Sequence, residues 1–446
     1  MKKGNILIIG CGISGLGAAK LAKHLNYEVM VSSKDFIPQA NKKTLKNIGV
    51  KFEEGVHSIS HLQWADLIVK SPGVPANIPI LELAKSESIS IISEIEFASR
   101  NTDAHIIAIT GTNGKTTTTQ MLWHILNNAG LNVGLAGNIG ISFSETIVEH
   151  KFDHYVLEIS SFQLEDIIDF KPNISILLNI EKDHMDRYHH DFDDYIKTKM
   201  KIQMNQDSDD SFIYFSHDKQ ITNNLKTVSA IKYPFGDCCL TENQYGGYII
   251  KDTITINTIK NNFTMTIHNL ALQGTHNLYN SMAASIAAST MGIKNEIIKQ
   301  SLSDFKGIEH RLEFVGKVAG VTFINDSKAT NCNSVYYALE STNNPIIWIC
   351  GGIDKGNDYS ILTELVEKKV KAIIFLGKNS NKIISQFNNS VETIIETANM
   401  ENAVQSAFRL ADAGDTVLLS PACSSFDLFK NYEDRGRSFK NCVLSI

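Results

Sequence analysis

The stretch HIIAITGTNGKTTTT, residues 105–119, has the residue types and order of a phosphate-binding loop. A short apolar run leads into a glycine-bounded turn, and Lys115, a run of threonines and a helical pattern follow. Backbone N–H groups in such a turn converge on an anion, and the positive end of the helix dipole adds to the attraction. We expect Lys115 to reach the terminal phosphates of a nucleotide and the Thr116 hydroxyl to bind Mg²⁺. The predicted loop contacts are Gly111, Thr112, Asn113, Gly114, Lys115, Thr116 and Thr117.

One position of this loop departs from the usual pattern G-x-x-x-x-G-K-[ST]. Ile109 stands where the first glycine is expected. An ordinary strand-to-helix turn is therefore the alternative, because glycine-rich turns commonly follow strands. The Lys115–Thr116 pair directly after Gly114 favours the phosphate loop.

Acidic and histidine side chains follow two further apolar runs of the same segment. Glu158 ends one run, and Asp183, His184 and Asp186 follow the other. Mg²⁺ prefers oxygen ligands, which makes Glu158 a candidate ligand. A polar strand end, or a structural histidine, is the alternative. The functional interpretation is favoured because the carboxyl ends of parallel strands meet at one edge of a sheet.

A second glycine-rich turn, Gly10-Cys11-Gly12-Ile13-Ser14-Gly15, follows the first predicted strand and fits the dinucleotide pattern G-x-G-x-x-G. That pattern also requires an acid at the end of the second strand, to hold a ribose hydroxyl. Here the second strand ends in Ser32-Ser33-Lys34. The sequence therefore favours a nucleotide-diphosphate site over a nicotinamide dinucleotide, and a purely structural turn is the further alternative.

The elements that must position these residues are apolar strands alternating with helical patterns, which predict an α/β fold with parallel sheets. At roughly 150 residues per domain, the 446 residues suggest three domains. Residues 211–268 form short β-rich pieces with no chemical signature, and Gly246-Gly247 is a hairpin candidate.

Composition excludes several classes of protein. The net charge of −6 carries no basic block, which argues against a nucleic-acid binder. No stretch approaches 18 uninterrupted apolar residues, so we expect no membrane span and no membrane partner. The seven cysteines are scattered, without a C-x-x-C pair, which favours a reducing cytoplasm and no metal-thiolate site.

Eight motifs occur in an order that resembles the Mur ligases, which build the peptide stem of bacterial peptidoglycan. They are GTNGKTTTT, LEISSFQLE, NIEKDHMDRY, GTHNLYN, HR, NDSKATN, GGIDKG and SPACSSFDLFKNYEDRG. The resemblance covers essentially the whole chain. KSPGVP, residues 70–75, and the last motif resemble the D-glutamate-adding branch of the family. The D-N-P-R motif of the branch that adds diaminopimelate or lysine is absent from the sequence.

The resemblance implies an ATP-dependent ligase that forms an amide through an acyl phosphate. The small-molecule substrates would be UDP-N-acetylmuramoyl-L-alanine and D-glutamate, and the protein would be a monomer. A Rossmann-like domain, residues 1–94, would bind the UDP precursor. A central P-loop domain, residues 95–307, would bind ATP, and a Rossmann-like C-terminal domain, residues 308–446, would bind the amino acid.

The resemblance also implies roles for individual residues. The precursor contacts would be Ile13, Ser14, Ser33, Lys34, Ser71, Gly73 and Asn138. Two Mg²⁺ ions would be held by Thr116, Glu158, His184 and Lys199. Contacts with ATP beyond the phosphate loop would be Asn277, Asn280, Arg311 and Asp326. D-Glutamate and phosphate would meet Lys328, Thr330, Lys355, Ser425 and Phe426. Lys115, Glu158, His184 and Lys199 are the catalytic candidates.

Two of these residues have an alternative role. By spacing alone, Lys199 is a solvated charge like its helix neighbours Lys197 and Lys201. The resemblance places it on the family's carbamylated lysine, whose anionic carbamate binds the second Mg²⁺. Helix capping is the alternative role for Asn277.

Several rival functions remain open. They are a Mur-type ligase for another amino acid, a folylpolyglutamate synthase relative, a nucleotide-dependent switch or transporter ATPase, and a nicotinamide oxidoreductase. The KSPGVP turn and the glycine-rich turn of residues 10–15 argue against the folate enzyme. A switch would not need Lys355 and Ser425.

Overall fold

The computed structural model describes residues 3–237, 245–272, 274–342, 344–354 and 356–446. Lys355, one of the predicted amino-acid contacts, lies outside the described residues. The chain forms two compact units, and each is described by itself. The first contains Met1–Leu270 and Asn277–Phe305, and the second contains Ala271–His276 and Lys306–Ile446.

The first sheet of the first unit has the strand order β3-β2-β1-β4-β5, and all its strands are parallel. Its strands are β1 Asn5–Ile9, β2 Glu28–Ser33, β3 Lys51–Glu54, β4 Leu67–Lys70 and β5 Ser90–Ser93. Its helices are α1 Ile13–His24, α2 Gln39–Asn47, α3 Ile59–Trp64 and α4 Pro79–Ser86. Side chains alternate along β1, so Ile6 and Ile8 join the core on the α1 and α2 side. Leu7 and Ile9 pack with α3 and α4 on the opposite face.

The second sheet of the first unit has nine strands among the described residues, in the order β14-β13-β12-β11-β10-β9-β6-β8-β7. They are β6 His105–Thr110, β7 Val133–Gly137, β8 His154–Glu158, β9 Ile174–Leu177, β10 Ser211–Phe215, β11 Ile231–Gly236, β12 Gly246–Ile250, β13 Thr253–Asn257 and β14 Asn262–Thr266. In this spatial order, all neighbouring strands between β12 and β7, with β6 among them, pair in parallel. The pairs β12–β13 and β13–β14 are antiparallel. The accompanying helices are α5 Glu94–Ser99, α6 Lys115–Asn128, α7 Phe143–Glu149, α8 Ser161–Leu164, α9 Phe192–Met200, α10 Lys219–Thr222, α11 Thr275–Thr290 and α12 Asn295–Asp304.

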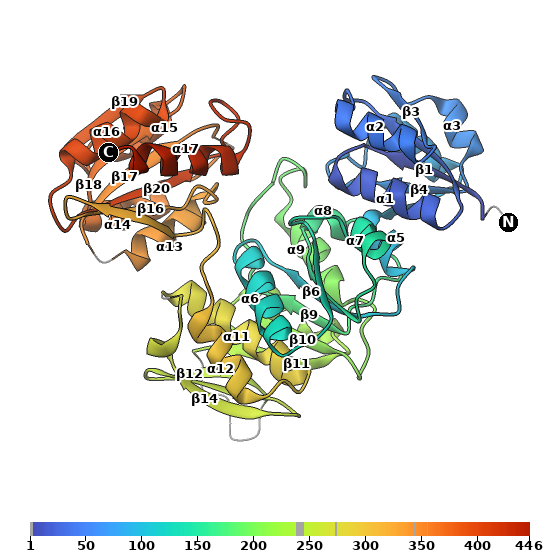
Figure 1. Ribbon diagram of the computed structural model, residues 1–446, viewed down its shortest axis with the longest axis horizontal. Coiled ribbons are helices and arrows are strands. Elements are labelled where there is room, and N and C mark those ends of the chain that lie inside the picture. The colour runs from blue at the N-terminus through green and yellow to red at the C-terminus, as the bar shows by residue number, and fades with distance from the viewer. Residues whose placement is uncertain (1–2, 238–244, 273, 343, 355) are drawn as a thin grey trace. The chain divides into compact units, whose positions relative to one another are not determined.

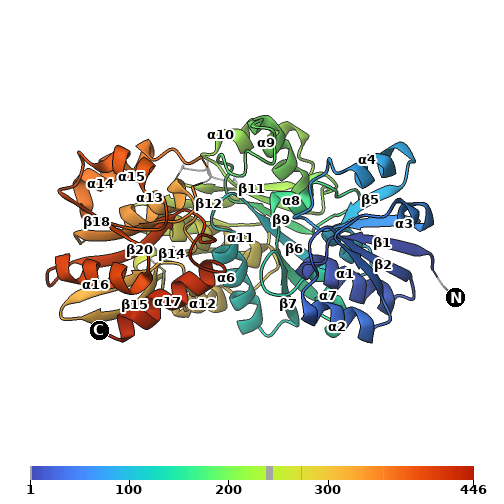
Figure 2. The same cartoon turned by 90° about the horizontal axis from the view of Figure 1, so that it is seen from above.

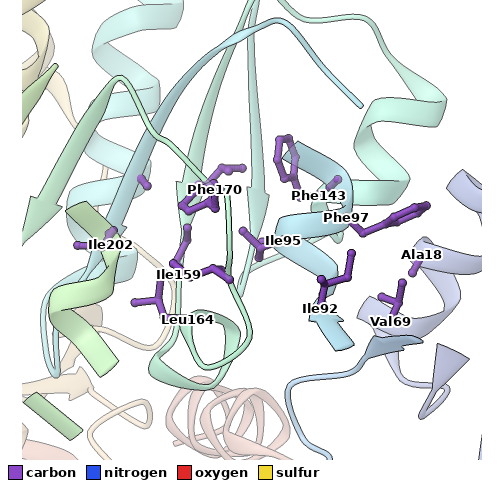
Figure 3. Packing of buried hydrophobic residues seen from close by; sticks show 14 of the residues in the cluster. Ala18, Val69, Ile92, Ile95, Phe97, Phe143, Ile159, Leu164, Phe170 and Ile202 are labelled. Carbon is purple, nitrogen blue, oxygen red and sulfur yellow. The ribbon is translucent and has the colours of Figure 1, made fainter. Parts of the chain in front are cut away.

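The two sheets of the first unit share one apolar core. Figure 3 shows Phe97 of α5 on the side of Ala18 and Val69, and Ile95 of the same helix on the side of Ile159. Helix α1 also lies beside α7 in both views (Figures 1 and 2). Burial of large apolar side chains stabilises such an arrangement by roughly 25 cal/mol per Å². The sheets of the first unit are therefore held by continuous packing as well as by the chain link through α5.

The second unit holds one doubly wound sheet in the order β15-β16-β20-β17-β18-β19. Its strands are β15 Glu313–Val318, β16 Val321–Asn325, β17 Ile346–Gly351, β18 Val370–Leu376, β19 Thr393–Thr397 and β20 Thr416–Ala422. Its helices are α13 Cys332–Ser341, α14 Thr363–Lys369, α15 Asn381–Phe387, α16 Met400–Leu410 and α17 Tyr432–Leu444. Trp348 packs on the side of α13, α14 and α15, and Ile347 packs on the side of α16 and α17. Only β15, at the edge, is antiparallel among the described strands of this sheet.

The predicted α/β class is confirmed, and one local prediction is wrong. Gly246 and Gly247 do not form a hairpin turn but begin β12. The turn between β12 and β13 lies at Lys251-Asp252, where Lys251 has φ 54°. A Cβ on Gly247 would lie 3.0 Å from Ile256 and 3.1 Å from Ile286. The glycine thus serves close packing of β12 and not chain reversal.

No helix in the described parts of the chain combines the length and the hydropathy needed to cross a membrane.

Candidate active site

The predicted phosphate loop connects β6 to α6. Gly114 is the residue before the helix and has φ 81°, a left-handed conformation that favours glycine. Helix α6 begins at Lys115, whose Nζ donates to the carbonyl oxygens of Gly111 and Thr112, both at 2.8 Å. The ammonium group therefore lies along the loop itself. The arrangement has the strand, turn and helix N-terminus of an anion site.

The loop after β9 holds the phosphate loop in place. The Asn113 amide donates to Asn179 Oδ1 at 2.8 Å, and the Asn113 side chain donates to Glu181 Oε2 at 3.0 Å. Thr112 Oγ1 lies 3.1 Å from the hydroxyl of Tyr195 on α9 and donates to Glu181 O at 3.1 Å. Asn179 and Tyr195 are not among the residues that the sequence predicted for the site. Their only signal was a place in or near the motif NIEKDHMDRY.

Glu158 ends β8, which pairs with β6, so its carboxylate lies at the edge that carries the phosphate loop. Its Oε1 accepts a hydrogen bond from Asn138 Nδ2 at 2.7 Å. Its Oε2 is buried and has no hydrogen-bond partner among the described residues. Thr116, on the first turn of α6, is also buried. An unpartnered buried carboxylate oxygen beside a phosphate loop fits a Mg²⁺ ligand.

Lys199 is buried, contrary to the expectation from spacing alone. It is 1 % exposed, and its Nζ donates to the Gly111 carbonyl at 2.8 Å. The same Nζ lies 4.8 Å from the centre of the Tyr195 ring. Burial first, and then the charge of Lys115, hold the pKa of Lys199 well below its usual value. Burial at this position therefore disfavours the charged ammonium form of Lys199.

His184 lies in the loop between β9 and α9 and has φ 54°. Its ring centre is 5.0 Å from that of Phe162, and its Nε2 lies 3.6 Å from Asp183 Oδ2. The side chain is partly exposed. A left-handed conformation at a residue other than glycine costs on the order of 1–3 kcal/mol and requires support from its surroundings.

The predicted precursor contacts fall at two places in the first unit. Most lie at the C-terminal edge of the first sheet: Ile13 and Ser14 on α1, Ser33 on β2, Lys34 after it, and Ser71 and Gly73 after β4. The Ser71 hydroxyl donates to the Gly10 carbonyl at 3.2 Å, which joins two of the loops. Asn138 lies apart from this group and bonds Glu158.

The two predicted adenosine contacts on α11 differ in their surroundings. Asn280 Oδ1 accepts from Thr118 Oγ1 at 3.1 Å and would meet a Cβ on Gly114 at 2.5 Å. Asn280 is therefore buried against the phosphate loop. Asn277 lies at the start of α11, and its carbonyl accepts from Ser281 Oγ at 2.6 Å.

The predicted residues of the second unit lie near the C-terminal ends of its parallel strands. Arg311 precedes β15, and Asp326, Lys328 and Thr330 follow β16. Asp326 Oδ2 accepts from Ser420 Oγ at 2.9 Å, and burial raises its pKa to about 7. Lys328 Nζ lies 3.7 Å from the centre of the Tyr432 ring, a cation–π contact.

A cavity of about 650 Å³ opens at the same edge of the second unit. Asp354 and Gly356, which flank Lys355, line it together with Phe426. Of the predicted amino-acid contacts that the structure describes, only Phe426 is among its lining residues. Ser425 is buried next to it in the chain, and Phe426 is 68 % exposed.

A separate acidic cluster in the second unit already contains a cation. Ligand atoms of Glu309, His310 and Glu313 lie within 4.8 Å of one another. The ammonium group of Lys440 donates to Glu309 at 2.9 Å and to Glu313 at 2.6 Å. The cluster is therefore an ion-pair network.

Family models match three consecutive parts of the chain. They are described as Mur ligase MurD-like, N-terminal domain, at residues 4–93, Mur ligase middle domain at residues 109–288, and Mur ligase, glutamate ligase domain, at residues 310–423. The UDP-N-acetylmuramoylalanine–D-glutamate ligase of Christiangramia forsetii is 48 % identical over 99 % of this chain and 99 % of its own. The protein of the same name from Porphyromonas gingivalis W83 is 46 % identical over 100 % of this chain and 99 % of its own.

Solved structures resemble this chain in fold. UDP-N-acetylmuramate-alanine ligase from Thermotoga maritima superimposes with a TM-score of 0.62 at 18 % identity, over 99 % of each chain. The MurF ligase of Thermotoga maritima, solved in complex with ADP, gives a TM-score of 0.62 at 15 % identity, over 94 % of this chain and 95 % of its own. At such identities the likeness concerns the fold alone.

Proposed function

The chain belongs to the Mur ligase family, and from this we propose that it joins D-glutamate to UDP-N-acetylmuramoyl-L-alanine with conversion of ATP to ADP and phosphate. The observation that carries the proposal is the near-complete alignment with relatives named for this reaction, at 48 % and 46 % identity. The reaction belongs to the synthesis of peptidoglycan precursors. The predicted cytoplasmic location and monomeric state stay predictions.

The proposed reaction has two steps. An oxygen of the L-alanyl carboxylate attacks the γ-phosphorus of ATP, the bond to ADP breaks, and an acyl phosphate forms. The amine of D-glutamate then attacks the acyl carbon, loses a proton, and phosphate leaves. The first step brings two anions together, so positive charge at the transferring phosphoryl group lowers its barrier. We assign that charge to Lys115, whose ammonium already lies along the loop.

We assign two Mg²⁺ ions to the first unit. Thr116 and Glu158 would hold one, which the unpartnered Oε2 of Glu158 supports. His184 and a carbamylated Lys199 would hold the second. Bound Mg²⁺ supplies charge stabilisation to the phosphoryl oxygens. The lowered pKa of Lys199 supports the carbamate, because burial favours the neutral amine, and CO₂ reacts with an amine and not with an ammonium ion.

The remaining assignments rest on the family resemblance. Precursor binding is assigned to the glycine loop, Ser33, Lys34 and the turn with Ser71 and Gly73, and Asn138 is assigned to the sugar-peptide portion. Asn277, Asn280, Arg311 and Asp326 are assigned to ATP. D-Glutamate and phosphate are assigned to Lys328, Thr330, Lys355, Ser425 and Phe426. The cavity beside Phe426 is a concave space of a size suited to a small ligand.

A matrix of phosphate-release assays tests the proposal. ATP and Mg²⁺ are offered with each UDP-muramoyl precursor and, in turn, with L-alanine, D-glutamate, L-lysine, diaminopimelate and D-alanyl-D-alanine. We expect release only with UDP-N-acetylmuramoyl-L-alanine and D-glutamate together. Release with another pair assigns the protein to another step. No release with any pair contradicts the ligase function.

A further inference from the structure

Two basic side chains without an assigned role, Lys70 and Arg187, meet the carboxylate of Glu165 in the first unit. Arg187 donates from Nε to Glu165 Oε1 at 3.0 Å and from Nη2 to Oε2 at 2.7 Å, a two-point pairing. Lys70 is 1 % exposed and donates to the same Oε2 at 3.0 Å. It also pairs with Asp166 at 2.8 Å. Two cations thus balance two carboxylates in a largely buried network.

The guanidinium of Arg187 also holds the turn that follows β4. Its Nη2 donates to the Val74 carbonyl at 2.8 Å and reaches the Pro72 carbonyl at 3.4 Å. This turn contains Ser71 and Gly73, which we assign to the precursor. One side chain therefore links the precursor turn of the first sheet to Glu165, which follows α8 beside the second sheet.

The backbone of Arg187 belongs to the loop that carries His184. The Arg187 amide donates to the His184 carbonyl at 2.9 Å. Its guanidinium carbon lies 5.0 Å from the centre of the Phe162 ring, and the His184 ring lies 5.0 Å from the same ring. Phe162 is thus shared by both side chains. These contacts supply support for the left-handed conformation of His184.

We propose that Arg187 is a positioning residue that holds the precursor turn Ser71–Val74 and the His184 loop at a fixed separation. The precursor carboxylate is thereby presented to the phosphate loop. The role deepens the proposed function and rests on it for its kinetic readout. Its geometric basis, four contacts from one guanidinium to two segments, is independent of the reaction.

The chemistry of the network requires arginine. Burial alone would raise the pKa of Glu165, but the hydrogen bonds and charges of Arg187 and Lys70 outweigh it and hold that pKa below its usual value. Glu165 is therefore ionised at neutral pH, and the pairing is ionic. A planar fork can reach both carboxylate oxygens and the Val74 carbonyl together, whereas a lysine ammonium is a compact point charge.

The test compares Arg187→Lys with Arg100→Lys. Arg100 forms a similar pair of bonds in the same unit, to Glu96 at 2.7 Å and to Asp169 at 2.8 Å, and has no role in the proposed site. For each variant we would measure the melting temperature, KM for the UDP precursor, KM for ATP and kcat. Calorimetric titration with UDP-N-acetylmuramoyl-L-alanine, without ATP or D-glutamate, gives a readout free of turnover.

We expect Arg187→Lys to bind the precursor roughly tenfold more weakly and to lose roughly ten- to hundredfold in kcat/KM for the precursor, because small misplacements of reacting groups are costly. KM for ATP should change less than about twofold, since the phosphate loop contacts are intact. Arg100→Lys should leave all three constants within about twofold of the wild type.

Two outcomes overturn the proposal. One is an Arg187→Lys protein with unchanged precursor affinity and kcat/KM, whatever its melting temperature. The other is an equal loss in Arg100→Lys. If Arg187→Lys does not fold, Phe162→Leu replaces it, because that change removes the ring that Arg187 and His184 share, together with its stacking on Tyr188, and the same split between the two KM values is expected. An inactive wild type that still binds the precursor contradicts the proposed function, while the titration continues to test Arg187.

Discussion

Lys115 and Lys199 direct their side-chain nitrogens to the same carbonyl oxygen, that of Gly111, at 2.8 Å each. Two ammonium ions so placed repel each other, and burial adds a desolvation cost for the one that is enclosed. Lys199 is the enclosed one, and its pKa is lowered accordingly. Lys115, to which we assign the charge at the phosphates, and Lys199, whose neutral form is favoured, are thus distinguished by their surroundings.

Replacing Lys115 by methionine tests the first of these roles. We expect Lys115→Met to lower kcat by roughly a thousandfold or more, because a preorganised charge at the transferring phosphoryl group is lost. The measurement is phosphate release with both substrates. Lys151→Met, on an exposed lysine of the same unit, is the control and should keep the wild-type rate. A Lys115→Met protein with a near-normal kcat would remove Lys115 from the mechanism.

Replacing Lys199 by alanine tests the second role. We expect kcat to fall by roughly a hundredfold or more, since the proposed ligand of the second Mg²⁺ is removed. Added formate or acetate should restore part of the rate, because a short carboxylate can replace the carbamate oxygens. The matched control is Lys197→Ala, on the same helix, where the lysine is exposed and pairs with Asp194 at 3.3 Å.

A direct signal accompanies the rate measurement for Lys199. Wild-type protein in ¹³C-labelled bicarbonate should show a carbamate resonance that Lys199→Ala lacks and Lys197→Ala keeps. A fully active Lys199→Ala protein would exclude the residue from the site. Loss of activity without a carbamate resonance in the wild type would leave the lysine necessary but unmodified.

Among the secondary-structure elements, helix α1 approaches strand β1 very closely at the glycine-rich turn of residues 10–15. A Cβ on Gly15 would lie 2.1 Å from the Gly10 carbonyl oxygen and 2.8 Å from Ser71 Oγ. The nearest atom belongs to the backbone and cannot rotate away. A Cβ on Gly12, three residues earlier, would meet nothing within 4 Å.

The pair Gly15→Ala and Gly12→Ala therefore makes a matched test of this contact. We expect Gly15→Ala to lower the unfolding free energy by about 1–3 kcal/mol through overpacking. It should also raise KM for the UDP precursor, because α1 moves relative to the turn with Ser71. Gly12→Ala should leave the melting temperature unchanged. Equal melting temperatures for the two variants would show that the first sheet tolerates the displacement of α1 that the added Cβ requires.

Element patterns and loop motifs were predictable from sequence to different degrees. Strand β1 follows the apolar run that precedes the glycine loop of residues 10–15, because a parallel strand buried on both faces is a continuous apolar segment. The prediction of a turn at Gly246-Gly247 was wrong. Gly247 makes room for a helix that packs across β12, and the local sequence does not show which helix packs there. The burial of Lys199 was likewise unpredictable from spacing, since the side chain packs against the Gly111 carbonyl of the phosphate loop and the Tyr195 ring.

The candidate site shows the same limit for paired side chains. The phosphate loop is local in sequence, so its residues could be named from a single motif. Arg187 and Val74 are separated by 113 residues, and only the packing of two sheets brings them together. Glu165 and Arg187 stand in motifs that the sequence does mark, yet their pairing is a property of the folded unit.

At the scale of the molecule, helix α5 is the covalent link between the two sheets of the first unit, and its apolar side chains lie in their shared core (Figure 3). Its first residue, Glu94, is 1 % exposed. The Glu94 Oε1 atom accepts from the Ser144 amide on α7 at 2.6 Å, and its Oε2 has no hydrogen-bond partner among the described residues. Burial raises the pKa of Glu94 to about 7.

This carboxyl group makes the stability of the first unit depend on pH. The folded state binds the proton more tightly than the unfolded state, whose pKa is near the usual 4.5. Between pH 4.5 and about 7, stability therefore falls as pH rises, because the folded protein must give up a proton that it prefers to keep. Above that window, ionised Glu94 carries a cost on the order of 3 kcal/mol.

Glu94→Gln tests this dependence, because the amide is nearly isosteric with the protonated acid and retains an acceptor for Ser144. Hydrogen–deuterium exchange of peptides that cover α5 and α7 measures local opening in wild type and variant at the same pH, so intrinsic exchange rates cancel. We expect greater protection in Glu94→Gln at pH 8 and equal protection near pH 5. Glu82→Gln, on an exposed acid of α4, should match the wild type throughout. If Glu94→Gln were protected as much as the wild type at both pH values, or less than the wild type at pH 8, ionisation of Glu94 would carry no cost in the folded state.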